Sequence, residues 1–482
     1  MNLTDNPTSS ARANLEIVAV GLGALMAALS QTLVLPVLPT IAADINASAT
    51  ETQWLLTSTL LVAAISVPIL GRMADIFGRR RVLVTSLGAL GVGSLLDALT
   101  TNPEWMIAGR AIAGLSAAAI PLGISLLASV LPAERKASAT ALISAMLGVG
   151  GALGLPLAGL IADNTDYHAL YWIGAVGAVL SIAMVLSFVG EPGTKGNRSI
   201  DVPGIVLLAG GLLCLVLPLS QAGTWGWGST RVIGLLLASV LLLTCLVLVE
   251  RRASSPLVDL TALANPPVAM TNVASVFFGF ALFASFVGTA NYVQAPAATG
   301  YGFGSSVLTA GLCLLPSGIL MLLLAPVAAR LCKTLGAGKV LAISGAIVAA
   351  GLLVRIGLVD HLWQVVVGAS IVGAGTGIGY ATLPTLINSH TPANALAAAN
   401  GINTLARSLG STLASALGGT LLASVTMSLG PAEVPSLTAY RVLFVICAGS
   451  ALTAAVLGLV IARAREDDGT ASTIEANALQ AP

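Results

Sequence analysis

The chain consists of long apolar stretches separated by short polar links. Each stretch has about the 20 apolar residues that an α-helix needs to cross a hydrocarbon core of about 30 Å. About fourteen such stretches can be recognised, near residues 15–39, 54–71, 82–101, 105–131, 138–162, 169–189, 202–220, 232–249, 269–294, 306–329, 340–358, 363–387, 396–425 and 440–462. A transmembrane barrel would instead show segments of about ten residues with alternating polarity. The pattern predicts an all-α polytopic membrane protein with about 14 transmembrane helices.

Composition and charge support this interpretation. Of the 482 residues, 56% are hydrophobic and 9% are charged, whereas soluble domains carry about 25% charged residues. Counted over alternate links, most Lys and Arg residues fall on the side that holds both termini. Because basic residues collect in short cytoplasmic loops, we expect both termini to be cytoplasmic and the protein to lie in the plasma (inner) membrane.

The link between the second and third stretches, Gly71–Arg81, is highly charged and has an echo later in the chain. Pro68, Arg72, Gly78, Arg81, Val82 and Leu83 recur 258 residues later as Pro326, Arg330, Gly336, Lys339, Val340 and Leu341. A separation of 258 also joins Trp105 to Trp363, and a separation of 260 joins Pro132, Gly150 and Gly159 to Pro392, Gly410 and Gly419. Internal duplication is a signature of secondary transporters. The alternative is chance similarity between helices rich in Leu, Ala and Gly.

The echo predicts two parallel six-helix repeats with a helix pair inserted between them. Residues 1–190 form the N-terminal six-helix half, 191–268 the inserted helix pair with its flanking loops, 269–463 the C-terminal six-helix half, and 464–482 a cytoplasmic tail. An even number of inserted helices keeps the two halves in the same orientation, as the matching basic links require.

Several short motifs, each weak alone, follow one another in an order that resembles the major facilitator superfamily, and within it the fourteen-helix branch of drug:proton antiporters. The resemblance covers nearly the whole chain. It rests on Gly71–Arg81, on Arg110 followed by Gly114, on an antiporter-like motif of Gly150, Gly154, Pro156 and Gly159, on Asp201–Gly204, Trp225–Trp227 and Pro256–Leu260 of the inserted pair, and on Gly401–Asn403 and Arg407–Gly410. The family implies alternating access between two six-helix halves.

The chain departs from that branch at three places. Ser30 stands where the branch usually has an acid in the first helix, and Ala113 stands where it has a glutamine. The proline expected after Gly154 is displaced to Pro156, and Ala158 replaces a glycine. Because the first-helix acid is missing, Asp97 becomes a candidate to replace it.

The charged link contains the residues expected to act as a gate, which are Gly71, Arg72, Asp75, Gly78 and Arg79. Asp75 can accept hydrogen bonds from arginines or from a helix N-terminus in one conformation and release them in another. The alternative is a topology anchor, because three consecutive arginines suffice to orient the loop. The second copy has Lys333 at the position of Asp75, so only the first half keeps the acid.

Asp97 and Arg110 are the candidates for proton coupling. Charges within membrane helices are costly and usually face the bundle interior or a watered cavity. The two residues lie at similar distances from the turn between the third and fourth helices, so they can form an ion pair that protonation of Asp97 breaks. One alternative is a static pair near the outer interface, and another is that the two side chains do not meet.

A polar stripe on the thirteenth helix is the main candidate for a substrate cavity. Asn400, Asn403 and Arg407 share one helix face, because residues three and four apart are neighbours on a helix. The alternative is helix–helix bonding through the asparagine amides. Further candidates for the cavity are Ser30, Gln31, Asn291 and Gln294.

The sequence offers little support for enzymatic chemistry. No pair of histidines has metal-ligand spacing, and the chain has no G-x-S-x-G or Walker motif. The glycine-rich run Gly373–Gly379 lies inside an apolar segment and lacks the spacing of a phosphate loop. We therefore expect no enzyme activity, no cofactor, no metal and no nucleic-acid partner.

Together these features predict a proton-coupled exporter of small amphiphilic or hydrophobic compounds, working as a monomer in the bilayer. Basic residues outnumber acidic ones in the expected cavity, which favours neutral or weakly acidic substrates over strongly cationic ones. A proton-linked importer of a small solute shares the same architecture. A non-transporting membrane sensor is a further alternative, although no soluble domain is present to relay a signal.

Overall fold

The computed structural model describes residues 7–191, 201–252, 263–357, 360–392, 395–429 and 432–478. The first half contains α1 (Pro7–Thr32), η1 (Leu35–Val37), α2 (Leu38–Asp44), α3 (Ala49–Phe77), α4 (Arg79–Leu99), α5 (Pro103–Gly114), η2 (Leu115–Ala118), α6 (Ala119–Val130), α7 (Ala133–Asn164) and α8 (His168–Phe188). The inserted pair is α9 (Val202–Trp225) and α10 (Thr230–Glu250). The second half contains α12 (Pro266–Gln294), η3 (Ala297–Thr299), α13 (Val307–Leu335), α14 (Ala337–Gly357), α15 (Leu362–Ser389), α16 (Leu396–Ser424), β1 (Thr426–Leu429), β2 (Ala432–Pro435) and α17 (Leu437–Ala478).

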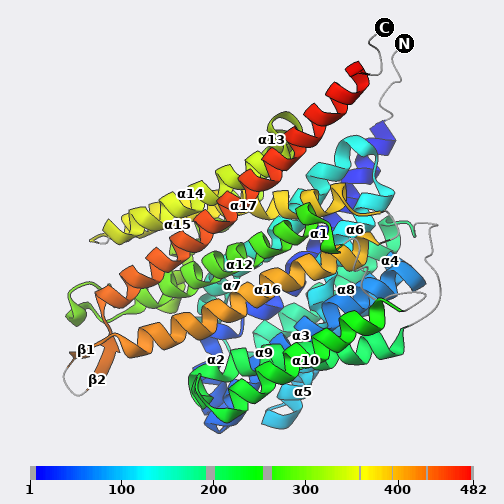
Figure 1. The fold of residues 1–482 in the computed structure, drawn as a ribbon. Coiled ribbons are helices and arrows are strands. Elements are labelled where there is room, and N and C mark those ends of the chain that lie inside the picture. The colour runs from blue at the N-terminus through cyan, green and yellow to red at the C-terminus, as the bar shows by residue number, and fades with distance from the viewer. Residues whose placement is uncertain are drawn as a thin grey trace.

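The long helices lie side by side in one bundle, with both termini at one end and the antiparallel β1–β2 hairpin at the opposite end (Figure 1). We call the end of the bundle that carries both termini the N/C end, and we call the opposite end the hairpin end. Within the described ranges, 13 helical spans are long and apolar enough to cross a membrane. The remaining long helix, α16, has 29 residues but carries Asn400, Asn403 and Arg407. The predicted polytopic, all-α architecture is confirmed.

The two charged links have the same geometry. α3 ends at Phe77 and α4 begins at Arg79, and 258 residues later α13 ends at Leu335 and α14 begins at Ala337. Gly78 and Gly336 each form the turn with a positive φ, of 110° and 82° respectively. Glycine adopts this backbone conformation without the steric cost that other residues meet. The two links therefore share their backbone geometry as well as their sequence pattern.

Two of the expected helices are interrupted at proline. The stretch expected as one helix over 105–131 is divided by η2 into α5 and α6. Pro121 explains the break, because it has no N–H to donate and its ring crowds the carbonyl of Ala117, four residues earlier. The stretch expected over 15–39 ends as an α-helix at Thr32, and η1 and α2 follow with a proline in the first turn of each.

The inserted pair covers one seam between the halves. α9 packs against both α3 and α16, where Leu208 and Leu212 join Ala64 and Leu405 in one apolar cluster. α10 packs mainly on α9, and only 17% of its most apolar window is buried. An apolar helix with so little protein contact faces lipid. On the opposite side of the bundle, α7 of the first half lies along α13 of the second.

Candidate functional site

The predicted gate is assembled at the N/C end. Asp75, buried in the last turn of α3, accepts a hydrogen bond from Arg79 Nη2 through Oδ1 (3.1 Å). Arg79 also donates to the Ser125 carbonyl on α6 (3.1 Å). Through Oδ2, Asp75 accepts the backbone N–H of Ala398 in the first turn of α16 (3.3 Å). A carboxylate at a helix N-terminus is favoured by the helix dipole, so this contact joins the first half to the second.

Two glycines of this link allow close packing. A Cβ built on Gly71 would lie 2.9 Å from the Ala397 carbonyl oxygen of α16. A Cβ on Gly78 would lie 2.5 Å from Glu191 Oε1. Glu191 accepts the backbone N–H groups of Arg80 and Arg81 (both 3.3 Å), capping the start of α4. Sequence reasoning missed Glu191, because nothing local in the sequence places the end of α8 beside this link.

The remaining members of the gate fit this arrangement. Arg72 is half-buried on α3, one turn before Asp75. In the second copy of the link, Lys333 is exposed on α13. The asymmetry expected from the sequence therefore has a structural counterpart: an acid that crosses between the halves in the first copy and an exposed base in the second.

The antiporter-like motif on α7 forms close helix contacts. Gly150 packs so closely against Ala28 of α1 that a Cβ on it would overlap the Ala28 methyl group. Gly154 packs in the same way against Thr32, whose Oγ1 donates to the Gly150 carbonyl (3.1 Å). The close approach of backbones through small residues is the usual way in which membrane helices associate.

The outer part of the same motif reaches the second half. A Cβ on Gly159 would lie 2.7 Å from the Leu308 backbone nitrogen of α13. The Pro156 backbone packs against Gly311, also on α13, more closely than any side chain would permit. The motif thus holds α7 to α1 on one side and to α13 on the other.

Asp97 and Arg110 are brought together, but they do not form an ion pair. Asp97 on α4 is 0% exposed, and neither carboxylate oxygen has a hydrogen-bond partner in the described part of the chain. The carboxylate lies against Gly109 of α5, where an added Cβ would overlap Oδ1. Among the described residues, no ion pair within 4.0 Å includes Asp97. The static pair considered above is therefore not formed in this conformation.

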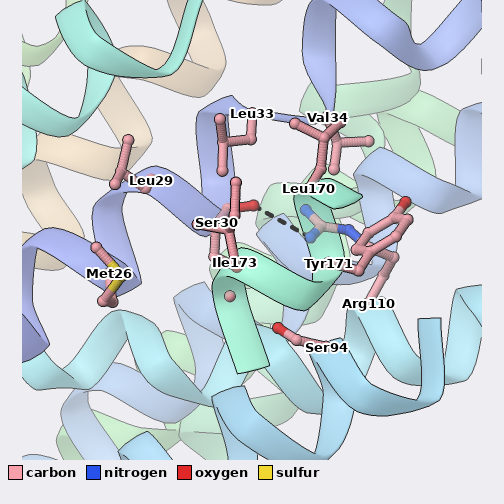
Figure 2. Close-up of a pocket in the computed structure, with 11 residues that line it drawn as sticks. Met26, Leu29, Ser30, Leu33, Val34, Ser94, Arg110, Leu170, Tyr171 and Ile173 are labelled. Atoms are coloured by element: carbon pink, nitrogen blue, oxygen red, sulfur yellow. Dashed lines mark hydrogen bonds between the residues drawn. The ribbon is translucent and has the colours of Figure 1, made fainter. Parts of the chain in front are cut away.

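The hydrogen bond that Arg110 donates goes to α1 and not to Asp97. Arg110 Nη1 donates to the Ser30 carbonyl (3.1 Å), and Figure 2 shows the guanidinium directed at Ser30 with Tyr171 beside it. The surrounding cavity, which Ser94 also lines, has a volume of about 10 Å³. That volume holds one water molecule at most. The cavity can therefore hold one water molecule but not an organic substrate.

The two asparagines on α16 make helix–helix bonds. Asn403 Nδ2 donates to Asn272 Oδ1 (3.0 Å) and to Ser275 Oγ (2.7 Å), both on α12. Asn400 Nδ2 donates to Asn388 Oδ1 of α15 (2.6 Å). In this conformation both asparagines therefore bond neighbouring helices to α16, which was the alternative to a role in a substrate cavity.

Arg407 faces the other half of the molecule. Its Nη1 donates to Ser144 Oγ on α7 (2.9 Å), and its Nη2 donates to Thr404 Oγ1 (3.1 Å). The guanidinium carbon stands 4.9 Å from the centroid of the Tyr380 ring on α15. Ser144 in turn donates to the Tyr380 carbonyl. Of the α16 stripe, Arg407 is the member that contacts the first half.

The other expected cavity residues lie near the hairpin end of α1 and α12. Ser30 is buried, and Gln31 beside it is half-buried. Asn291 is exposed in the last turn of α12, and Gln294 donates to the Ala290 carbonyl of its own helix (3.0 Å). Ser30 lines the small cavity beside Arg110, whereas the side-chain partners of Arg407 are Ser144, Thr404 and the Tyr380 ring.

The second half contains a buried arginine to which sequence reasoning gave no role. Arg355 on α14 donates to Thr289 Oγ1 and to Ser285 Oγ (3.4 Å) of α12. Its guanidinium carbon lies 4.1 Å from the centroid of the Phe444 ring on α17. The repeat offset of 258 would have drawn attention to it, because Arg355 is the counterpart of Asp97. In the described part of the chain, no cluster of three or more His, Cys, Asp or Glu residues could hold a metal ion.

Known proteins share this architecture. The sequence profile of the Major Facilitator Superfamily matches residues 20–294 and residues 276–479. The tetracenomycin C resistance and export protein of Streptomyces glaucescens is 29% identical over 417 residues, which are 85% of this chain and 76% of that protein. Multidrug resistance protein 3 of Bacillus subtilis is 25% identical over 414 residues, 84% of this chain and 79% of that protein.

A solved structure has the same fold. The crystal structure of the human organic anion transporter MFSD10 (TETRAN) matches with a TM-score of 0.65, covering 92% of this chain and 99% of that one. The sequence identity is 15%, so this likeness concerns the fold alone.

Proposed function

The chain belongs to the major facilitator superfamily, a family of membrane transporters, and from that membership we propose that it exports small amphiphilic or hydrophobic compounds by proton-driven alternating access. The names of its relatives, a tetracenomycin C resistance and export protein and a multidrug resistance protein, support the direction of transport. In this proposal the N/C end faces the cytoplasm, the bilayer is the plasma membrane, and the transporter works as a monomer.

The observation that carries the proposal is the gate between Asp75 and the N-terminus of α16. The hydrogen bond from Ala398 to Asp75 crosses from one half to the other at the N/C end. Gly71 and Gly401 lie in the same contact, each packed on the backbone of the facing helix. This conformation is closed on the proposed cytoplasmic side. Separating these contacts is the step that would admit a substrate from the cytoplasm.

Asp97 is the proposed site of proton exchange. An ionised carboxylate that is buried without a partner is costly, so this conformation favours the neutral side chain. A conformation in which Arg110 or water reaches Asp97 favours the ionised form of this side chain. Such a difference between two states is what lets a proton gradient shift a conformational equilibrium. Because Ser30 occupies the usual first-helix acid position, Asp97 supplies the missing carboxyl group.

Flux through proteoliposomes tests the proposal. The purified chain is reconstituted with a pH-sensitive dye inside, and efflux of a hydrophobic fluorescent reporter is followed under an imposed pH gradient. Opposite movement of reporter and protons is expected. Movement in the same direction would instead identify an importer, and the absence of any flux would favour a sensor.

A further inference from the structure

Arg407 places a buried positive charge where the two halves meet. The residue is 1% exposed and lies near the middle of α16. Its contacts, described above, are the hydroxyls of Ser144 and Thr404 and the ring of Tyr380. The guanidinium Nε has no hydrogen-bond partner among the residues that the structure describes. All of these neighbours are neutral.

Acidic residues are nearly absent from the helices of the second half that surround this charge. Between Pro266 and Ser424 the sequence contains one acidic residue, Asp360, which lies in the link before α15. On α7, the helix that faces Arg407 from the first half, the acids Glu134 and Asp163 stand near the two ends. None of the ion pairs in the described ranges includes Arg407. Buried charges are normally paired, but the part of the chain that the structure describes supplies no counter-ion for Arg407.

The position of Arg407 connects this charge with transport. Ala398 forms the gate, and Arg407 follows nine residues later on the same helix, about 14 Å deeper into the bundle at about 1.5 Å per residue. In the proposed transport cycle, opening of the N/C end would move α7 away from α15 and α16 and so take the Ser144 hydroxyl away from the guanidinium. The guanidinium would then face the opening, with the Tyr380 ring beside it. Substrate sites near the bilayer midplane are usual in secondary transporters.

We propose that Arg407 determines substrate specificity by binding the anionic group of a planar, apolar organic anion such as an aromatic carboxylate. The inference rests on the proposed export function and names its substrate class. Arginine keeps its charge at all relevant pH values, and its planar fork matches a carboxylate with two parallel hydrogen bonds. The substrate anion replaces the Ser144 hydroxyl as partner, and the Tyr380 ring packs against its flat body.

Three fluorescent probes with one ring system test this proposal. Binding of 2-anthracenecarboxylate, neutral 2-anthracenecarboxamide and cationic 2-(aminomethyl)anthracene is measured on the full-length chain in lipid nanodiscs. The wild type is expected to bind the carboxylate at least about tenfold more tightly than the amide, and the cation least tightly, because charge-assisted bidentate pairs are roughly twice as strong as neutral ones.

Variants of Arg407 and Ser144 test whether the guanidinium causes the preference for the carboxylate probe. In Arg407→Gln the affinity for the carboxylate should fall to that for the amide, with amide binding unchanged. Arg407→Lys, which keeps the charge without the fork, should show an intermediate preference. Ser144→Ala is the matched control, because it removes the hydroxyl that crosses between the halves and leaves the guanidinium in place. Its preference for the carboxylate should be retained.

Three results would overturn the proposal. These are equal wild-type binding of carboxylate and amide, tightest binding of the cation, or an equal loss of all three probes in Arg407→Gln, which would indicate a purely structural bridge. The wild-type comparison requires no variant, so it decides the matter even if Arg407→Gln does not fold.

The flux assay separates this inference from the proposed function. A carboxylate preference without proton-driven flux would contradict the export function and leave the anion site standing. Proton-driven export of a neutral reporter without a carboxylate preference would support the export function and contradict the anion site.

Discussion

Asp97 on α4 and Arg355 on α14 occupy equivalent positions in the two repeats, 258 residues apart, and both side chains are buried. The counterpart of Arg110 at the same offset is Gly368, where an added Cβ would overlap the Arg355 side chain. Each half therefore holds a guanidinium against its first helix, supplied by α5 in the first half and by α14 in the second. At this pair of equivalent positions, the first half has a carboxyl group, which can gain or lose a proton, and the second half has a guanidinium.

This asymmetry predicts that Asp97→Asn uncouples transport from protons. Asparagine keeps the shape of the side chain but cannot exchange a proton. We expect export driven by a pH gradient to fall at least about tenfold, equivalent to about 1.4 kcal/mol, while exchange of substrate without a gradient continues. Glu104→Gln is the control, because Glu104 is an exposed acid in the first turn of α5. Unaltered gradient-driven export in Asp97→Asn would contradict the assignment.

Gly109→Ala should destabilise the fold by crowding Asp97. The added methyl group would overlap the carboxylate oxygen, so α4 and α5 must move apart. Overpacking of this kind typically costs about 1–3 kcal/mol, which should lower the thermal midpoint of the purified protein. Gly88→Ala on α4 is the matched control, because nothing lies within 4 Å of its added Cβ. Equal midpoints for the two variants would show that the contact between Asp97 and Gly109 is absent.

Asp75→Asn should loosen the gate at the N/C end. The substitution removes the buried ion pair with Arg79 and weakens the acceptor for the Ala398 N–H. Hydrogen bonds to charged groups contribute about 1.5–3 kcal/mol, so the open population should rise about tenfold or more. A cysteine introduced at Ala141, which is buried against α13, reports opening through its rate of reaction with a maleimide in an otherwise cysteine-free chain.

Lys333→Asn is the control for the gate variant. Lys333 is the repeat counterpart of Asp75 and is exposed, so its loss should leave the labelling rate of the cysteine at position 141 unchanged. If both variants accelerated labelling equally, the gate would not depend on the acid.

Gly159→Ala should weaken the contact between α7 and α13. Its Cβ would lie 2.7 Å from the Leu308 nitrogen and 2.8 Å from the Leu308 Cα, and backbone atoms cannot yield as a flexible side chain can. We expect a loss of about 1–3 kcal/mol in stability, measured as a lower thermal midpoint. The repeat counterpart, Gly419, has nothing within 4 Å of an added Cβ. Gly419→Ala should therefore be neutral or stabilising by about 0.5–1 kcal/mol, and a loss there equal to that at Gly159 would disprove the argument.

Much of the architecture could be predicted from the sequence because the signals are local. A membrane helix satisfies its backbone hydrogen bonds within one segment, so a run of about 20 apolar residues identifies it without reference to the rest of the chain. The charged link and its second copy could likewise be recognised from residue identities and a constant sequence offset. The breaks before Ala119 and after Thr32 escaped prediction, because prolines within membrane helices are often tolerated.

The candidate site was less predictable because it depends on which way each side chain turns. The spacing of Asn400, Asn403 and Arg407 placed them on one stripe, yet the asparagines bond to α15 and α12 while Arg407 reaches α7. Asp97 and Arg110 were matched by depth, yet Arg110 donates to the Ser30 carbonyl instead of to the acid. Small rotations of neighbouring helices decide such partners, and no sequence period encodes them.

By itself, then, the sequence determined that the chain is a helical membrane protein, and it showed a charged link that recurs 258 residues later with Lys333 in place of Asp75. These properties depend on hydrophobicity, repetition and residue identity along one segment at a time. Only the tertiary structure decided that Asp75 contacts α16 and that, among the residues that the structure describes, Asp97 has no hydrogen-bond partner and Arg407 has no counter-ion. The contacts of Asp75 with Ala398 and of Arg407 with Ser144 join residues 323 and 263 positions apart. Such contacts arise from packing, and the sequence of one segment does not indicate which other segment it meets.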